Sequence, residues 1–150
     1  MANAEQVIKE GAAQYLESGE EILVAAVVAP RGNTQRIAGA RELGVSQTRK
    51  QMDSAEAAGF VLEAPMALAL TDRRLLALKI GAPIGGGIGG KVKDLLGAVP
   101  ISEVNSIQAK RLLIGSRLIL TIRGVEIKLE AGAGAPTKPL AEAFQKLRTG

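Results

Sequence analysis

The glycine-rich run Gly85-Gly-Gly-Ile-Gly-Gly-Lys91 has the spacing of two phosphate-binding patterns, G-x-G-x-x-G and G-x-x-x-x-G-K. Such loops bind phosphate because successive backbone N–H groups and a helix N-terminus point at the anion. The second pattern also needs a Ser or Thr after the lysine to bind magnesium, and this chain has Val92 there. Nucleotide folds further need a parallel βαβ unit, whereas the flanking patterns predict antiparallel strands. We therefore interpret the run as a flexible inter-strand loop and predict no cofactor.

The same loop has features of a membrane contact. Two apolar residues, Ile84 and Ile88, flank the central glycines, and Lys91 and Lys93 follow directly. Apolar side chains can enter a membrane interface while neighbouring lysines reach anionic headgroups. The four residues are thus a candidate site for an anionic membrane surface. The alternative is that the isoleucines pack against the domain or a neighbouring subunit.

Residues 37–48 have the spacing of a helix-turn-helix, with Ala40 and Gly44 at the small-residue positions and polar side chains following. Lys50 then stands where the second helix needs an apolar residue. A solvated, partly helical insertion is the favoured interpretation, and a nucleic-acid partner is the less favoured one. If nucleic acid does bind, the basic side chains that would hold it are Arg36, Arg41, Arg49 and Lys50.

Absent residue types exclude most catalytic chemistry. The chain has no cysteine, histidine or tryptophan, which excludes disulfides, thiolate nucleophiles, imidazole or thiolate metal sites and histidine general bases. No pair of carboxylates has a spacing that suggests acid–base work. We therefore predict a non-enzymatic binding or structural module with no catalytic residues, no metal and no small-molecule substrate.

Charged pairs elsewhere in the sequence are interpreted as surface features. Arg73 and Arg74 lie in a predicted turn and are expected to cap it or to pair with Asp72. Lys110-Arg111 lies in a predicted strand, where adjacent side chains point to opposite faces and make no single patch. Glu20-Glu21 is interpreted as solvated.

Length and charge fit one domain. The chain has 150 residues, with 19 Lys and Arg against 15 Asp and Glu, so its net charge of +4 mildly favours anionic partners. No targeting signal is visible, and the longest apolar run, residues 22–29, is far shorter than the ~20 residues that span a bilayer. We therefore expect a single cytoplasmic domain over residues 1–150.

Periodicity predicts mainly antiparallel strands between two amphipathic helices. A long insertion follows the first strand, and a glycine-rich loop, with one or two helical turns at 91–96, divides the later ones. The predicted elements are a helix within 1–18, strands at 22–29, 60–63, 66–71, 75–80, 98–101, 104–113, 118–123 and 125–130, the insertion at 31–60, the loop at 81–97 and a helix at 137–148.

Three segments resemble the bacterial pleckstrin-homology-like (PH/GRAM-like) domains. They are Gly19-Glu-Glu-Ile-Leu23, Leu70-Thr-Asp-Arg-Arg-Leu75 and the strand-to-strand link at 99–107, and the resemblance covers roughly 19–29 and 60–148. It implies an α+β fold: a strongly bent antiparallel sheet or barrel closed by the C-terminal amphipathic helix, here with an added N-terminal helix. It also implies self-association, edge strand to edge strand, into a homo-oligomer. The N-terminal helix is expected to offer a second apolar stripe to a neighbouring copy.

Overall fold

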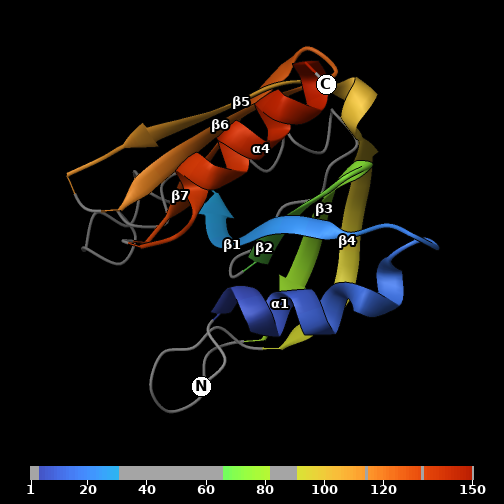
Figure 1. The fold of residues 1–150 in the computed structure, drawn as a ribbon. Helices are drawn as coiled ribbons and strands as arrows, with labels where there is room; N and C mark the ends of the chain where they lie inside the picture. Colours follow the sequence, from blue (N-terminus) through green and yellow to red (C-terminus); the bar gives the residue numbers. More distant parts are fainter. Residues whose placement is uncertain (1–3, 31–65, 82–90, 114, 133, 150) are drawn as a thin grey trace.

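The chain folds as a bent antiparallel sheet between two helices, and its computed structural model describes residues 4–30, 66–81, 91–113, 115–132 and 134–149 (Figure 1). Seven strands lie in the order β4-β3-β2-β1-β7-β6-β5, and no pairing of these described strands joins β4 to β5, so the sheet does not close into a barrel. The helices are α1 (Ala4–Ala12), α4 (Thr137–Thr149) and the 3-10 turns η1 (Ala13–Tyr15) and η2 (Ile101–Glu103). The strands are β1 (Ile22–Pro30), β2 (Met66–Thr71), β3 (Arg74–Ile80), β4 (Val92–Pro100), β5 (Val104–Arg111), β6 (Ser116–Ile122) and β7 (Val125–Ala131).

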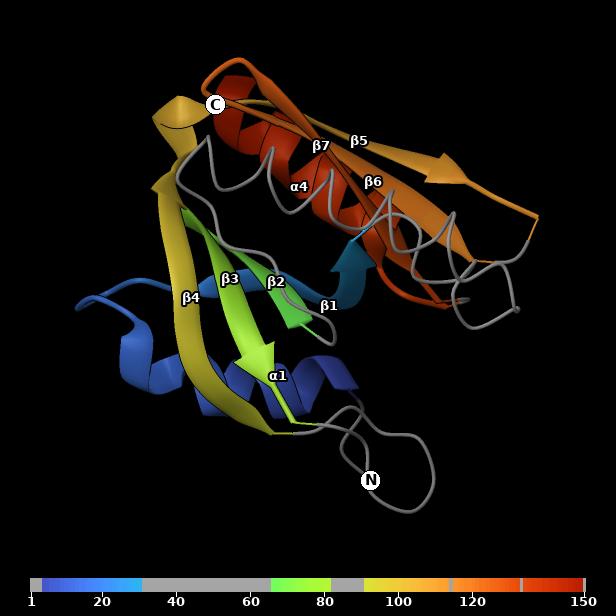
Figure 2. The same cartoon turned by 180° about the vertical axis from the view of Figure 1, so that it is seen from behind.

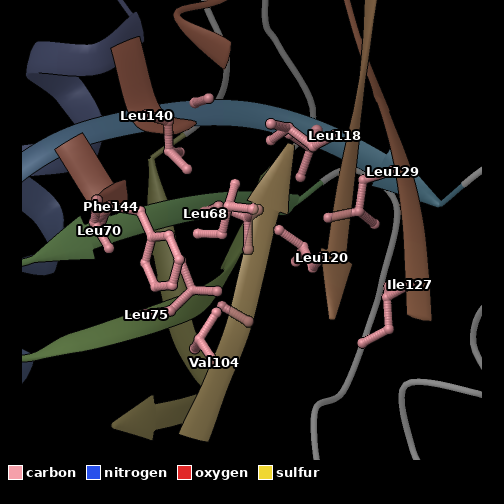
Figure 3. Close-up of a cluster of buried hydrophobic side chains, with 14 of the residues drawn as sticks. Leu68, Leu70, Leu75, Val104, Leu118, Leu120, Ile127, Leu129, Leu140 and Phe144 are labelled. Carbon is pink, nitrogen blue, oxygen red and sulfur yellow. The ribbon is translucent and has the colours of Figure 1, made fainter. Parts of the chain in front are cut away.

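The main core lies on the concave face of the sheet, beneath α4 (Figure 3). Strand alternation supplies one side of it, because Leu118, Leu120 and Ile122 of β6 all point inward and are fully buried. Helix α4 supplies the other side with Leu140 and Phe144, one helical turn apart. Each such side chain contributes about 1.5–3 kcal/mol of burial free energy. The predicted C-terminal helix therefore covers the main core.

A second cluster lies on the opposite face of β1–β4, where α1 packs (Figure 2). Strand β2 shows why the helix can approach so closely: its large side chains belong to the main core, while Ala67 and Ala69 face α1. Gly11 of α1 lies against Val92, and a Cβ added to Gly11 would be 2.9 Å from the Val92 Cβ. The expectation that this helix offers an apolar stripe to a neighbour is wrong, because Ile8 is 1% exposed on the chain's own sheet.

Helix α1 also satisfies a backbone donor of β1. The Glu5 carboxylate accepts the backbone N–H of Ala25 at 3.0 Å, and Ala25 is fully buried. Strand β1 pairs with β7 only near its end, at Ala29 and Pro30. Over the rest of β1, a buried N–H that points away from β2 therefore needs a partner from outside the sheet, and Glu5 provides one for Ala25.

Replacing Glu5 with Ala should lower the free energy of unfolding by about 1–3 kcal/mol, because the Ala25 N–H would stay buried without an acceptor. The matched control is Glu10→Ala on the same helix. Glu10 is exposed and only accepts a bond from the Gln6 side chain, so its loss should change stability by less than about 0.5 kcal/mol. Urea unfolding of both variants measures the difference, and equal stabilities would contradict the role given to Glu5.

Strand β4 corrects the prediction of helical turns at 91–96 and of a separate strand at 98–101. The structure has one continuous strand from Val92 to Pro100. Its pairing with β3 shifts register twice, which leaves one extra residue at Lys93 and another at Leu96. Each bulge moves the next apolar side chain by one position, so Val92, Leu95 and Ala98 all face α1 at a spacing of three. That spacing resembles helical periodicity in the sequence.

Candidate binding surfaces

The start of β1 and the β2–β3 turn are joined by a buried ion pair. The Glu20 carboxylate accepts bonds from Arg74 Nη2 at 2.7 Å and Arg74 Nε at 3.0 Å. Its remaining acceptor positions take the Thr71 hydroxyl at 2.6 Å and the Glu17 backbone N–H at 2.9 Å. The second Arg74 bond from Nη2 goes to the carbonyl oxygen of Tyr15 at 3.0 Å. We call Glu20, Thr71 and Arg74 the clasp.

The clasp corrects two predictions from the sequence. Glu20 is buried instead of solvated, and Arg74 pairs with Glu20 and Glu17 instead of Asp72. Asp72 accepts the backbone N–H of Glu21 at 3.1 Å. Both oxygens of Glu20 accept two bonds each within the chain, so its carboxylate serves to hold the fold together.

The side-chain bond from Arg74, helped by the bonds from Thr71 and Glu17, lowers the pKa of Glu20 to about 2 against the opposing effect of burial. The same pair raises the pKa of Arg74. A carboxyl group whose pKa is lower in the folded state stabilises the fold above its unfolded pKa of 4.5, and that contribution disappears as the pH falls toward 2. The 2.5-unit difference corresponds to about 3 kcal/mol.

Unfolding free energy should therefore fall by about 3 kcal/mol more between pH 5 and pH 2 in the wild type than in Glu20→Gln. The variant itself should be less stable at pH 7, because the partly buried Arg74 loses the closer of its two carboxylate partners. Urea titrations at a series of pH values measure both effects. The control is Glu21→Gln, which alters the exposed neighbouring carboxylate and should keep the wild-type acid dependence. Parallel curves for the wild type and Glu20→Gln would refute the assignment.

The lipid candidates fall partly on described residues. Lys91 and Lys93 are exposed at the base of the β3–β4 hairpin, which the bond from the Gly81 N–H to the Lys91 carbonyl closes at 3.0 Å. Ile84 and Ile88 lie outside the described residues, so the joint site stays a prediction.

All four nucleic-acid candidates, Arg36, Arg41, Arg49 and Lys50, also lie outside the described residues. The same holds for the whole of the predicted insertion at 31–60. Nucleic-acid binding therefore stays a prediction.

The end of the β5–β6 hairpin is a surface that the sequence analysis missed. Leu113 there is fully exposed, with a relative exposure of 101%. Lys110 and Arg111 precede it and are both exposed, and Leu112 donates its N–H to the Gly115 carbonyl at 3.1 Å. We call residues 110–113 the β5–β6 tip. The pattern in the sequence that could have indicated this surface is the basic pair Lys110-Arg111, which two leucines follow directly.

The two end strands of the sheet differ in regularity. Strand β4 carries the bulges at Lys93 and Leu96. Strand β5 shifts register once near its start, and then residues 106–111 pair with β6 without a break. Gln108, in the middle of that regular run, is exposed. Among the described strands, β5 over residues 106–111 is therefore the end strand with the more regular pairing.

Within residues 4–30, 66–81, 91–113, 115–132 and 134–149, no helix has the length and apolar character needed to cross a membrane. No cluster of three or more carboxylate side chains suited to a metal ion is found there either.

Two solved PH domains are similar to this chain in structure. The N-terminal PH domain of Vps36 superposes with a TM-score of 0.52 at 12% identity, covering 90% of this chain and 86% of that one. A pleckstrin homology domain from Shewanella amazonensis SB2B matches with a TM-score of 0.49 at 14% identity, covering 94% and 95% of the two chains.

No protein-family model matches the sequence, and no curated protein matches it. The likeness to PH domains is therefore one of fold, and the GRAM-like part of the resemblance stays a prediction. The predicted α+β architecture, with a bent sheet, a C-terminal helix and an added N-terminal helix, is confirmed. The chain has a pleckstrin-homology-like fold.

Proposed function

We propose that this chain is a non-enzymatic PH-like module that self-associates by pairing the free edge of β5 with β5 of a second copy. PH folds are generally non-catalytic binding modules. The observation that carries the proposal is the unbroken register of residues 106–111 at the end of the sheet. A regular end strand presents a row of backbone N–H and C=O groups that another strand can pair with.

Two features favour β5 over β4 as the pairing edge. Bulges in an end strand twist it away from a flat partner, and β4 has two of them along its length. Antiparallel pairing of two β5 strands around Ile107 also keeps like charges apart. Lys110 and Arg111 of one copy would then lie at the start of the other strand, near Val104, and away from Lys110 and Arg111 of that copy.

This pairing is isologous, because the same strand contributes from both copies. It joins the two sheets edge to edge, with their concave faces on the same side. Helix α1 lies outside the contact. Helix α1 is therefore removed from the self-association surface that the sequence predicted, consistent with its buried stripe.

Light scattering of the purified wild type should give about twice 15.5 kDa at micromolar concentration. The double variant Ser106→Lys with Gln108→Lys should give about 15.5 kDa, because it places lysines opposite each other across the two-fold axis. Each opposed like-charge pair costs about 0.2–1 kcal/mol, in addition to the loss of a flat uncharged edge.

The matched control is Gln145→Lys with Thr149→Lys, which adds the same two charges at exposed positions of α4. It should keep the mass of the wild type. A wild-type monomer at micromolar concentration would overturn the proposal, as would equal masses for the two double variants. Circular dichroism of each variant verifies that the sheet is retained.

A further inference from the structure

Two leucines are the exposed large apolar side chains among the described residues. Leu113, in the β5–β6 tip, is fully exposed at 101%, and Leu23, in β1, is 36% exposed. Neither belongs to the hydrophobic cluster on either face of the sheet. Single exposed leucines are common on protein surfaces, so the argument depends on what surrounds each of the two.

Basic side chains surround Leu113. Lys110 and Arg111 precede it, and both are exposed. Lys110 is paired with Arg117 across the hairpin, so these two side chains point to one face of it. Arg111, the next residue along the strand, points to the opposite face. The tip therefore presents positive charge on both of its faces.

Acidic side chains surround Leu23. The pairing of β1 with β2 shifts register between Ile22 and Val24, so Leu23 is the extra residue of a bulge. Glu21, two residues earlier, is exposed, and its backbone N–H is accepted by the exposed Asp72 carboxylate at 3.1 Å. We call Glu21, Leu23 and Asp72 the β1 bulge.

The β1 bulge lies in a region with net negative charge. Glu17, whose side chain is 60% exposed, adds a third carboxylate beside the two of the bulge. The exposed Arg73 is a cation in this region, and its guanidinium lies close to Gly19. The pair of Glu20 and Arg74 in the clasp is neutral overall. Three carboxylates against Arg73 therefore leave two net negative charges.

The tip and the start of β1 lie at opposite sides of the domain in both views (Figures 1 and 2). One chain therefore cannot bring its own tip to its own β1 bulge, whereas two copies can. Each surface consists of an exposed leucine among charges, and the charges have opposite signs on the two surfaces. Every copy thus carries two surfaces that complement each other in apolar character and in charge.

We propose that the β5–β6 tip of one copy docks on the β1 bulge of a second copy, with Leu113 packed against Leu23 and the cations of the tip beside the carboxylates. A contact between two different surfaces is heterologous, so it repeats from head to tail. It does not use the pairing of β5 with β5 and goes beyond the proposed function. Where both contacts form, each dimer presents two tips and two bulges and is linked to further dimers.

This contact is small, because the end of one hairpin meets one strand bulge. Small interfaces are typical of weak and transient association, since the loss of translational and rotational freedom opposes binding. We therefore expect the contact at near-millimolar protein concentration and low salt. The pairing through β5 is expected at micromolar concentration, so the two kinds of association are separated by concentration.

Sedimentation equilibrium of the full chain from micromolar to near-millimolar concentration tests the proposal. The parent protein is Ser106→Lys with Gln108→Lys, which removes the β5 pairing, so failure of either proposal is distinguished from failure of the other. The average mass of the parent should rise with concentration above its micromolar value, and less so at high salt. Leu113→Ser and Leu23→Ser, each added alone, should weaken association by roughly 10- to 100-fold, because one leucine then stays in water.

Charge reversal on the two surfaces identifies the contact. In the parent, Lys110→Glu with Arg111→Glu should prevent association, and so should Glu17→Lys with Glu21→Lys, because each places like charges opposite each other. An equal mixture of the two reversed proteins should associate again. In the mixture the reversed tip meets the reversed bulge and the native tip meets the native bulge. A protein damaged by its substitutions would not recover on mixing.

The matched control for charge is Lys138→Glu with Lys146→Glu, which makes the same change of charge at exposed positions of α4. It should associate as the parent does, and thermal unfolding verifies that every variant is folded. Equal loss of association in this control would overturn the proposal, because net charge alone would then explain the reversed variants.

Three further outcomes would also overturn the proposal. One is a parent whose mass does not rise with concentration, which would leave a separate acidic protein as the partner of the tip. Another is association by Leu113→Ser or Leu23→Ser that equals that of the parent. The last is a mixture of the two reversed proteins that does not associate.

Discussion

The buried carboxylate of Glu20 is the constraint on which the rest of the structure depends. A charged group out of water is costly unless it is paired and fully hydrogen-bonded. Glu20 lies just before β1 and meets that condition only when the β2–β3 turn and the segment after η1 are in place, because its partners Thr71, Arg74 and Glu17 come from these two segments. The clasp therefore fixes where β1 begins and how α1 reaches the outer face of the sheet.

The position of α1 decides what remains available for interactions. With α4 on the concave face and α1 on the outer face, the β1–β4 half of the sheet is covered on both sides, and β2 is buried at every residue. The β5–β7 half has its inner face alone in the main core. Interactions with other molecules are therefore expected on the β5 side, where the free edge and the tip both lie.

One strand thus supplies two surfaces of different chemistry. The middle of β5 presents backbone groups along a straight edge, which suits a second strand. Just beyond its end, the exposed Leu113 follows the basic pair Lys110-Arg111. Antiparallel pairing of two copies around Ile107 would direct the two tips to opposite ends of the dimer, with Lys110 and Arg111 at the ends of the shared edge and Leu113 beyond it.

Local pattern determined much of this fold from the sequence alone. The β6–β7 hairpin, the strands around the Thr-Asp-Arg-Arg turn and the α4 stripe of Leu140 and Phe144 follow from alternation and helical spacing, which each segment carries within itself. The candidate residues in 31–60 and at Ile84 and Ile88 lie outside the described part of the chain, so their roles stay predictions.

Tertiary structure alone decided the features that depend on residues far apart in the chain. Glu20 looks solvated until Arg74, which follows 54 residues later, is placed beside it. The spacing of Val92, Leu95 and Ala98 looks helical until pairing with β3 shows that two bulges produce it. The apolar side chains of α1 look available to a partner in the sequence, but in the structure they pack on the chain's own sheet. Leu113 looks like a core residue in the sequence, but in the structure it is fully exposed. In each case burial depends on long-range packing, and no local periodicity records it.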